Sequence, residues 1–364
     1  QIVYERRAND IMTDRTVSNL WIVNVDGSRH RPLVSGTVGA TSPHWSPQGD
    51  RIAYVQDTGS GTGIHVRWMD TGQTALLANL QKSPADLTWS RDGRWLAFVM
   101  SVPAKSEPIA KPRTKPEGAE WSEPVKVIDT VHYRRDGQGF LETAHAHILL
   151  LAAHGRSPRH VTSGAPNAER PVSWITDGSG ILFSANRDDG WELASGESDV
   201  YRISVVDGTL TQLTDRQGGE HAPTMSPDGR QIAYIYDDNR MIPYRNNILH
   251  VMVQDGSGDR ALTAGLDSSV RSIQWAGNRQ VYFYYDRRAV RYVARASMSG
   301  EISDVVKGLG GTSLGRPYLS GSFTVSSNGT VAYTAGQAQR PAEVAVSDRR
   351  GDRVLTRLND DLLD

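Results

Sequence analysis

Cysteine is absent from the 364 residues, which excludes disulfides, thiolate metal sites and a cysteine nucleophile. Net charge is almost absent as well, because 40 Lys and Arg oppose 41 Asp and Glu. Such a balance gives no long-range field to attract nucleic acid or an anionic membrane surface. No apolar run reaches the roughly 18 residues that a membrane span needs. The composition therefore favours neither a nucleic-acid partner nor a membrane span, and it leaves cytosol and periplasm equally open as compartments.

Helical periodicity is also lacking, and a short repeat stands in its place. A phrase of the form Pro-x-Trp-Ser-x-Asp-Gly, followed by a short apolar strand, is clearest at 43–49, 87–93 and 223–229. Its third position recurs at 45, 89, 174, 225, 275 and 325, in steps of 44, 85, 51, 50 and 50 residues. A period of about 40 to 50 residues is the size of one four-stranded propeller blade.

Each copy of the phrase has the chemistry of a tight hairpin turn. The Gly is free to take a positive φ, and the strands on both sides are rich in Trp, Ile, Tyr and Val. A second hairpin follows each first one, so that two hairpins make a blade. The sequence therefore predicts an all-β fold, a seven-bladed β-propeller of four-stranded antiparallel blades, with Trp and Tyr packed between blades. The predicted blades are 1–36, 41–80, 86–163, 171–215, 221–264, 271–308 and 320–358.

The first predicted blade begins abruptly, because residues 2–5 match the second strand of a blade. Its Trp-Ser-Pro-Asp-Gly strand would lie before Gln1, so we expect the natural chain to extend upstream.

The single long step indicates an insertion, which the sequence places at 101–126 in the third blade. Five prolines and several Lys and Arg favour extended, exposed backbone there. Either a mobile solvated loop or an arm that contacts another domain or subunit fits this composition. We expect the chain to return to the sheet at 125–129. The Gly-rich turn that follows, 133–140, carries Arg134 and Arg135, which either bind a carboxylate bidentately or are simply solvated.

Catalytic motifs are weak. Residues 311–315 match Gly-x-Ser-x-Gly around Ser313, but a nucleophile elbow needs a strand before the Ser and a helix after it. Gly-rich flanks and the nearby Pro317 predict a loop between the sixth and seventh blades instead. His145 and His147 alternate on a predicted strand, which is weak evidence for a metal. The sequence gives no ground for a cofactor, a metal or a catalytic residue.

Several segments together resemble the propeller of bacterial S9 peptidases, of the acylaminoacyl-peptidase and dipeptidyl-peptidase-5 type. The blade phrase alone is shared with TolB-like propellers. The more specific likeness rests on 119–121 leading to 133–137, on 309–311 leading to 316–318, on 340–344, and on 355–363. That last segment is similar to the exit from the propeller into an α/β-hydrolase domain, so that 359–364 would begin a linker to it.

The resemblance implies a serine peptidase whose Ser, Asp and His lie on the hydrolase domain, which we expect beyond Asp364. It implies that the propeller has no catalytic residue and gates access of short peptides to the active site. The chain's partners would be that domain and short peptides. Tyr133, Arg134, Arg135 and Glu142 are the candidates for substrate or interface contacts. Relatives of this kind occur in the bacterial cytoplasm or periplasm.

Two other interpretations remain. A free-standing TolB-like propeller would bind protein partners through its surface. A propeller enzyme with a metal or carboxylate site in its channel is disfavoured, because the sequence shows no cluster of ligands.

Overall fold

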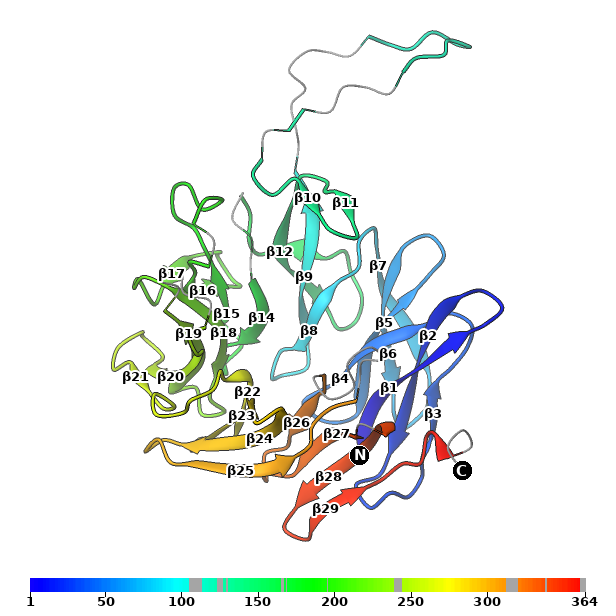
Figure 1. The fold of residues 1–364 in the computed structure, drawn as a ribbon. Helices are drawn as coiled ribbons and strands as arrows, with labels where there is room; N and C mark the ends of the chain where they lie inside the picture. The colour runs from blue at the N-terminus through cyan, green and yellow to red at the C-terminus, as the bar shows by residue number, and fades with distance from the viewer. Residues whose placement is uncertain are drawn as a thin grey trace.

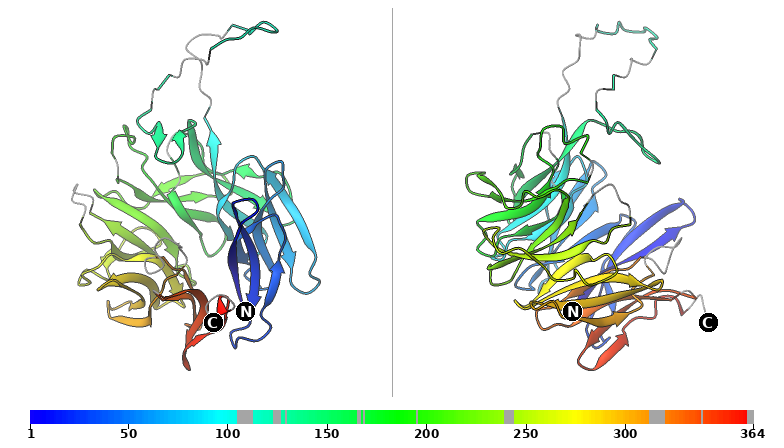
Figure 2. Two further views of the ribbon diagram at one scale, coloured as in Figure 1. Left: turned by 45° about the vertical axis from the view of Figure 1, so that its right-hand side comes forward. Right: turned by 60° about the vertical axis from the view of Figure 1, so that its left-hand side comes forward.

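The computed structural model describes residues 1–104, 113–122, 127–128, 130–164, 167, 169–194, 196–238, 244–311, 320–337 and 339–360. Seven antiparallel sheets stand around a common axis as the blades of a propeller (Figures 1 and 2). This confirms the predicted fold class. Within the described residues, no helix is long and apolar enough to cross a membrane.

The first sheet has three strands and each of the other six has four, in chain order from the axis outward. The first three sheets are built from β1 (Ile2–Asp10), β2 (Arg15–Val23), β3 (Arg31–Val34); β4 (Ala40–Trp45), β5 (Arg51–Asp57), β6 (Thr62–Trp68), β7 (Thr74–Leu80); and β8 (Ala85–Trp89), β9 (Trp95–Pro103), β12 (Ala144–Ala152), β13 (Arg159–His160).

The remaining four sheets follow the same plan. They are β14 (Glu169–Trp174), β15 (Gly180–Ala185), β16 (Asp199–Ser204), β17 (Leu210–Gln212); β18 (Gly219–Met225), β19 (Gln231–Asp237), β20 (Ile248–Val253), β21 (Arg260–Ala261); β22 (Arg271–Ala276), β23 (Gln280–Arg287), β24 (Val290–Ser297), β25 (Ile302–Lys307); and β26 (Phe323–Val325), β27 (Val331–Gln337), β28 (Arg340–Asp348), β29 (Gly351–Val354). Among the described strands, no sheet combines strands from the two ends of the chain.

The repeated phrase stabilises both the turn and the contact between blades. In the third sheet, Ser90 Oγ donates to Asp92 at 2.6 Å and accepts from the Trp95 amide at 2.9 Å, while Gly93 takes a φ of 69°. The Trp of the phrase donates its indole Nε1–H to a backbone carbonyl of an earlier sheet: Trp89 to His44, Trp174 to Thr88, and Trp275 to Thr224. The expected packing of Trp between blades is therefore confirmed for these three residues.

The core lies between successive sheets rather than inside one. Phe98 of the third sheet is fully buried in one cluster with Ile64 of the second. Phe183 of the fourth sheet is equally buried against Ile148 of the third. Each sheet thus buries apolar side chains on both faces, which explains the near-continuous apolar runs in the inner strands.

The insertion differs from its predicted bounds. β9 continues to Pro103 and pairs directly with β12, with Pro103 opposite Ala144, so the extra residues lie between these two. The expected return to the sheet at 125–129 was wrong for its described part: Val127 and Ile128 are outside any strand and 62% and 51% exposed. An alternating apolar segment needs an open strand edge, and β12 already occupies the edge of β9. Residues 125, 126 and 129 lie outside the described residues.

Candidate functional site

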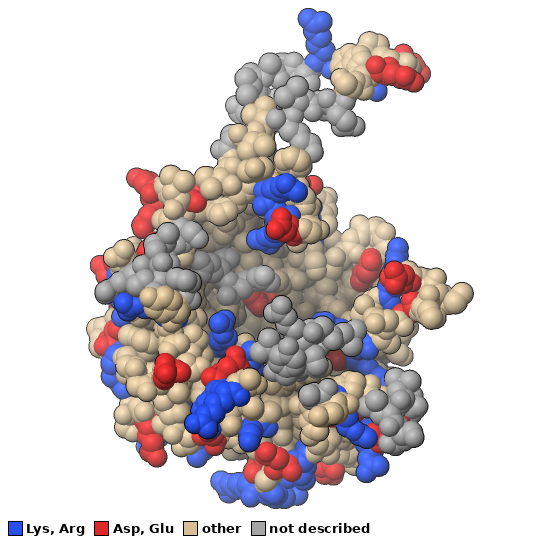
Figure 3. All heavy atoms as spheres, viewed as in Figure 1, with Lys and Arg blue, Asp and Glu red and all other residues tan. Residues whose placement is uncertain are grey.

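The antiparallel order of the strands divides the connections between two faces of the ring. Turns between the first and second strands, and between the third and fourth, lie on one face, which we call the turn face. Connections from the second strand to the third, and from one sheet to the next, lie on the opposite face, which we call the loop face. The insertion joins β9 to β12 and therefore belongs to the loop face. Figure 3 shows the ring hollowed at its centre.

Exposed large apolar side chains are distributed unequally between the two faces. The first sheet has three strands, and its β1 takes the place of a blade's second strand, so its β1–β2 connection counts as second-to-third. The second-to-third-strand connections carry Ile11 and Met12, 93% and 87% exposed, Leu193 at 80% and Tyr244 at 84%. Among the described turns on the turn face, only Val206, 85% exposed, is a side chain of this kind. Exposed apolar groups gathered on one face are typical of a surface that another body covers.

The structure brings three of the four predicted site residues together in one small hairpin. Strands β10 (Arg134–Arg135) and β11 (Gly139–Phe140) pair with each other apart from the blades. The Tyr133 ring lies 6.2 Å from the Phe140 ring, and the Leu141 amide donates to the Tyr133 carbonyl at 2.8 Å. Residues 133–140 are all exposed.

The fourth predicted residue, Glu142, ties the hairpin to the neighbouring connection between sheets. The Lys82 ammonium lies 2.8 Å from the Glu142 carboxylate, and the hydrogen bond and charge of Lys82 lower the pKa of Glu142. Both side chains are largely exposed, so the pair orients the hairpin more than it stabilises the fold. On the other side, the Val131 amide donates to Glu192 of the fourth sheet's loop at 3.4 Å.

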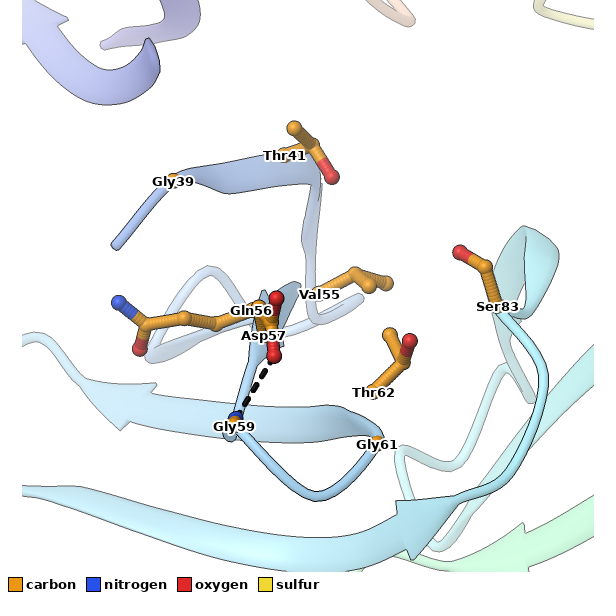
Figure 4. A pocket seen from close by; sticks show the side chains of 9 residues that line it. All are labelled: Gly39, Thr41, Val55, Gln56, Asp57, Gly59, Gly61, Thr62 and Ser83. Atoms are coloured by element: carbon orange, nitrogen blue, oxygen red, sulfur yellow. Dashed lines mark hydrogen bonds between the residues drawn. The ribbon is translucent and has the colours of Figure 1, made fainter. Parts of the chain in front are cut away.

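A polar hollow of about 510 Å³ lies beside Lys82, between the second sheet and the connection to the third (Figure 4). Its lining carries the hydroxyls of Thr41, Thr62 and Ser83 together with the carboxylate of Asp57. Asp57 Oδ1 accepts a hydrogen bond from the Gly59 amide at 2.7 Å, which fixes the carboxylate at the edge of the hollow. These groups can accept and donate hydrogen bonds to a peptide backbone.

The weak metal and nucleophile candidates do not gain support from the geometry. His145 and His147 do lie on β12, but the described residues contain no group of His, Asp or Glu suited to hold a metal ion. The His147 ring is buried next to the Thr162 hydroxyl, and burial lowers its pKa. Ser313 and the rest of its motif after Gly311, like residues 361–364 of the predicted linker, lie outside the described residues.

Among the residues that the structure describes there is one Ser–His contact, between Ser198 Oγ and His221 Nδ1 at 3.2 Å. Ser198 is only 3% exposed, and its Oγ lies 3.2 Å from both the carbonyl and the amide of Glu220. This hydroxyl therefore joins two strands and lies buried, away from any substrate.

A charged cluster between the fourth and fifth sheets was missed by the sequence analysis. Arg216 bonds Glu220 at 2.6 Å, Asp259 at 2.9 Å and the Tyr234 hydroxyl at 2.6 Å. Its guanidinium lies 3.9 Å from the centre of the Tyr236 ring. Glu220 is fully buried, and burial raises its pKa to about 7. The residues come from different strands and follow no motif, so no sequence signal could have found them.

Comparison with known proteins shows that the chain is similar to peptidases. Residues 101–243 match the model of the dipeptidyl peptidase IV N-terminal region. Dipeptidyl-peptidase 5 of Porphyromonas endodontalis is 27% identical over 64% of the chain, and that of Porphyromonas gingivalis 23% over 84%. The chain spans 35% and 46% of these two relatives. It is thus related to peptidases while covering less than half of either.

Solved structures extend the likeness to nearly the whole chain. The acylaminoacyl peptidase of Pyrococcus horikoshii superimposes on 98% of this chain with a TM-score of 0.71 at 18% identity, and 51% of that chain is covered. At that identity the likeness concerns the fold. The Tol-Pal system protein TolB of Francisella tularensis is 21% identical over 66% of the chain, with 55% of TolB covered.

Proposed function

The chain belongs to the N-terminal β-propellers of the S9 peptidases, and we propose that it covers the active site of a serine hydrolase domain in the same polypeptide. In this role residues 1–358 are the propeller, and 359–364 begin the linker to the hydrolase domain. The loop face is the covering surface, and the ring admits short peptides while it holds back folded protein.

The apolar residues of the loop face carry this proposal. Ile11, Met12, Leu193 and Tyr244 are exposed in the connections of the first, fourth and fifth sheets, whereas the turn face has only Val206 among its described turns. Leaving such side chains in water costs about 1.5–3 kcal/mol each relative to burial. A domain docked on the loop face would remove that cost.

The C-terminal residues emerge on the same face. Glu343 near the start of β28 accepts hydrogen bonds from Thr356 Oγ1 at 2.6 Å and from the Leu358 amide at 2.8 Å. Arg6 of β1 donates to the Leu358 carbonyl at 3.2 Å. These bonds fix the chain next to β1 and β28, so a domain that follows would begin at the loop face.

Tyr133, Arg134, Arg135 and Glu142 are proposed as interface or substrate contacts. The Lys82–Glu142 pair holds their hairpin beside the hollow that contains Asp57. A peptide that reaches this part of the loop face would meet two guanidinium groups, an aromatic ring and a set of hydroxyls.

The chain by itself is proposed to lack hydrolase activity, because in its described part the one Ser–His contact is buried and bonded to backbone. A fluorophosphonate probe tests this directly. The full-length protein should be labelled and residues 1–364 should not. Labelling of residues 1–364, at Ser313 or elsewhere, would contradict the proposal.

Hydrogen exchange tests the covered face. Amides at 10–15, 190–194 and 244–247 should exchange more slowly in the full-length protein than in residues 1–364, while those at 205–208 should not change. Replacing Ile11 and Met12 by Ser should reduce this protection, and Val206→Ser is the matched control because its side chain is equally exposed on the other face. Equal exchange in the two proteins would refute the docking.

The alternative is a free-standing propeller that binds protein partners through the loop face, as the TolB likeness suggests. The open reading frame beyond Asp364 separates the two. About 250 further residues with a Gly-x-Ser-x-Gly between a strand and a helix support the peptidase, and an early stop codon supports the binding module.

A further inference from the structure

A second hollow on the loop face, at the sixth sheet, is lined by cations. It has a volume of about 530 Å³ and is formed by Arg287, Arg288, Val290, Tyr292 and Lys307. Three of the five lining residues are positively charged and none is acidic, in a chain whose overall charge is close to zero.

One of the three cations is held in place by its neighbours. The Arg287 guanidinium lies 4.3 Å from the centre of the Tyr292 ring and 2.8 Å from the Asp304 carboxylate. Asp304 also accepts a hydrogen bond from the Tyr285 hydroxyl at 2.7 Å. An arginine oriented in this way loses little side-chain entropy when it binds an anion.

The other two cations have no acidic partner within the described residues. Neither Arg288 nor Lys307 forms an ion pair there, and the other nearby carboxylate, Asp286, is bonded to Arg291 at 2.8 Å. An anion that enters the hollow would therefore meet two uncompensated charges beside the oriented Arg287.

The turn that presents Arg288 is strained. The two residues between β23 and β24, Arg288 and Ala289, have φ values of 51° and 60°. A two-residue hairpin turn with both φ values positive strongly favours Asn-Gly, because other residues crowd their Cβ atoms in this conformation. Arg288 thus occupies the turn despite this crowding, and the turn projects its side chain at the hollow.

We propose that this hollow binds a carboxylate, with Arg288 and Lys307 as its principal ligands and Arg287 as an oriented third. The carboxylate would come from the C-terminus of a peptide held against the loop face, or from an acidic side chain. The identification of the ligand as a peptide held against the loop face rests on the proposed function. The prediction that the hollow binds a carboxylate does not, because it follows from the lining residues of this chain.

The test uses residues 1–364 and two matched probes. Acetyl-trialanine carries a terminal carboxylate, and its C-terminal amide differs only in lacking that charge. Isothermal calorimetry should detect binding of the acid and roughly tenfold weaker binding of the amide. Acetyl-Ala-Glu-Ala-amide carries its carboxylate on a side chain and distinguishes the two sources. If acetyl-trialanine binds and this peptide does not, the hollow recognises a C-terminal carboxylate. If both bind, the hollow is a general carboxylate site.

A double variant distinguishes loss of carboxylate binding from loss of folding, because it should weaken binding while it stabilises the protein. Arg288→Asn with Ala289→Gly removes the charge and relaxes the turn, so affinity for the acid should fall roughly tenfold while Tm rises by about 1–2 °C. Lys307→Gln should also weaken binding without altering the backbone. Arg349→Asn, in an exposed turn on the other face, is the control and should bind normally.

Two results would overturn the proposal: equal affinity for the acid and the amide, or unchanged affinity in both hollow variants. Neither result bears on docking of a hydrolase domain, because that is measured by hydrogen exchange in the full-length protein. The two proposals can therefore fail separately.

Discussion

Replacing Glu220 by Gln should remove a pH dependence of stability that originates between the fourth and fifth sheets. Glu220 is fully buried, with one carboxylate oxygen bonded to Arg216 and the other, Oε2, without a hydrogen-bond partner among the described residues. Burial raises its pKa from the ordinary 4.5 to about 7, and Asp199 contributes to the rise. Gln preserves the shape and the acceptor for Arg216 but cannot ionise.

The size of the effect follows from the shift in pKa. The folded protein keeps the proton on Glu220 up to about pH 7, whereas the unfolded chain releases it near 4.5. The stabilising contribution is therefore complete below pH 4.5 and is lost as pH rises through 7. At about 1.4 kcal/mol per pKa unit, ionisation of the folded protein costs about 3 kcal/mol, and Gln avoids that cost.

The assay is urea unfolding followed by tryptophan fluorescence, for both proteins, at several values between pH 5 and pH 8. The quantity of interest is the difference in free energy of unfolding, because other groups titrate in the same range. Burial lowers the pKa of His147 and of His250, so their contributions to stability rise with pH and oppose that of Glu220. These contributions cancel in the difference between wild type and variant.

We expect the two proteins to be similarly stable at pH 5 and the variant to gain about 3 kcal/mol on wild type by pH 8. Glu142→Gln is the control, because its carboxylate is exposed and its pKa is lowered by Lys82. Its difference from wild type should stay constant over the same range, because solvent screens an exposed carboxylate. Parallel curves for wild type and Glu220→Gln would refute the reasoning, since they would show that Glu220 ionises normally in the fold.

Two further predictions concern the contacts that hold blades and insertion in place. Trp89→Phe removes the indole bond to the His44 carbonyl and should lower the free energy of unfolding by about 1–2 kcal/mol in urea, whereas Trp121→Phe, at a half-exposed position, should be neutral. Lys82→Gln breaks the exposed pair with Glu142, so hydrogen exchange at 133–141 should accelerate while global stability changes by less than about 1 kcal/mol. A loss of several kcal/mol would show that this pair supports the fold itself.

The sequence could predict the blades because each one repeats the same local chemistry. The phrase around Trp89 contains the turn, its Ser–Asp hydrogen bond and the residue that contacts an earlier sheet, all within a few positions. The step between copies then gives the size of a blade. The three residues of the β10–β11 turn that resemblance singled out do lie together, although their role remains a prediction.

Contacts between segments distant in sequence could not be predicted in the same way. The end of the insertion depends on which strand pairs with β9, and the apolar alternation at 125–129 indicates strand character without naming a partner. The Arg216 cluster joins the connection between the fourth and fifth sheets to side chains on β18, on β19 and in the turn before β21, and these share no motif. Its members come together only once the fifth sheet is folded.

The copies that depart from the repeat show how the ring tolerates the loss of its Trp. Met225 and Val325 replace it in the fifth and seventh sheets, and no indole bond is possible there. In each case the residue before the Trp position in the preceding sheet supplies the bond: Ser173 Oγ accepts from the Met225 amide at 3.3 Å, and Gln274 Oε1 from the Val325 amide at 3.1 Å. At each of these junctions the later sheet still donates to the preceding one, but a backbone amide bonds a side-chain oxygen where an indole would bond a backbone carbonyl. The ring therefore requires a hydrogen bond at this position rather than a particular residue, which is why the weaker copies of the phrase still form blades.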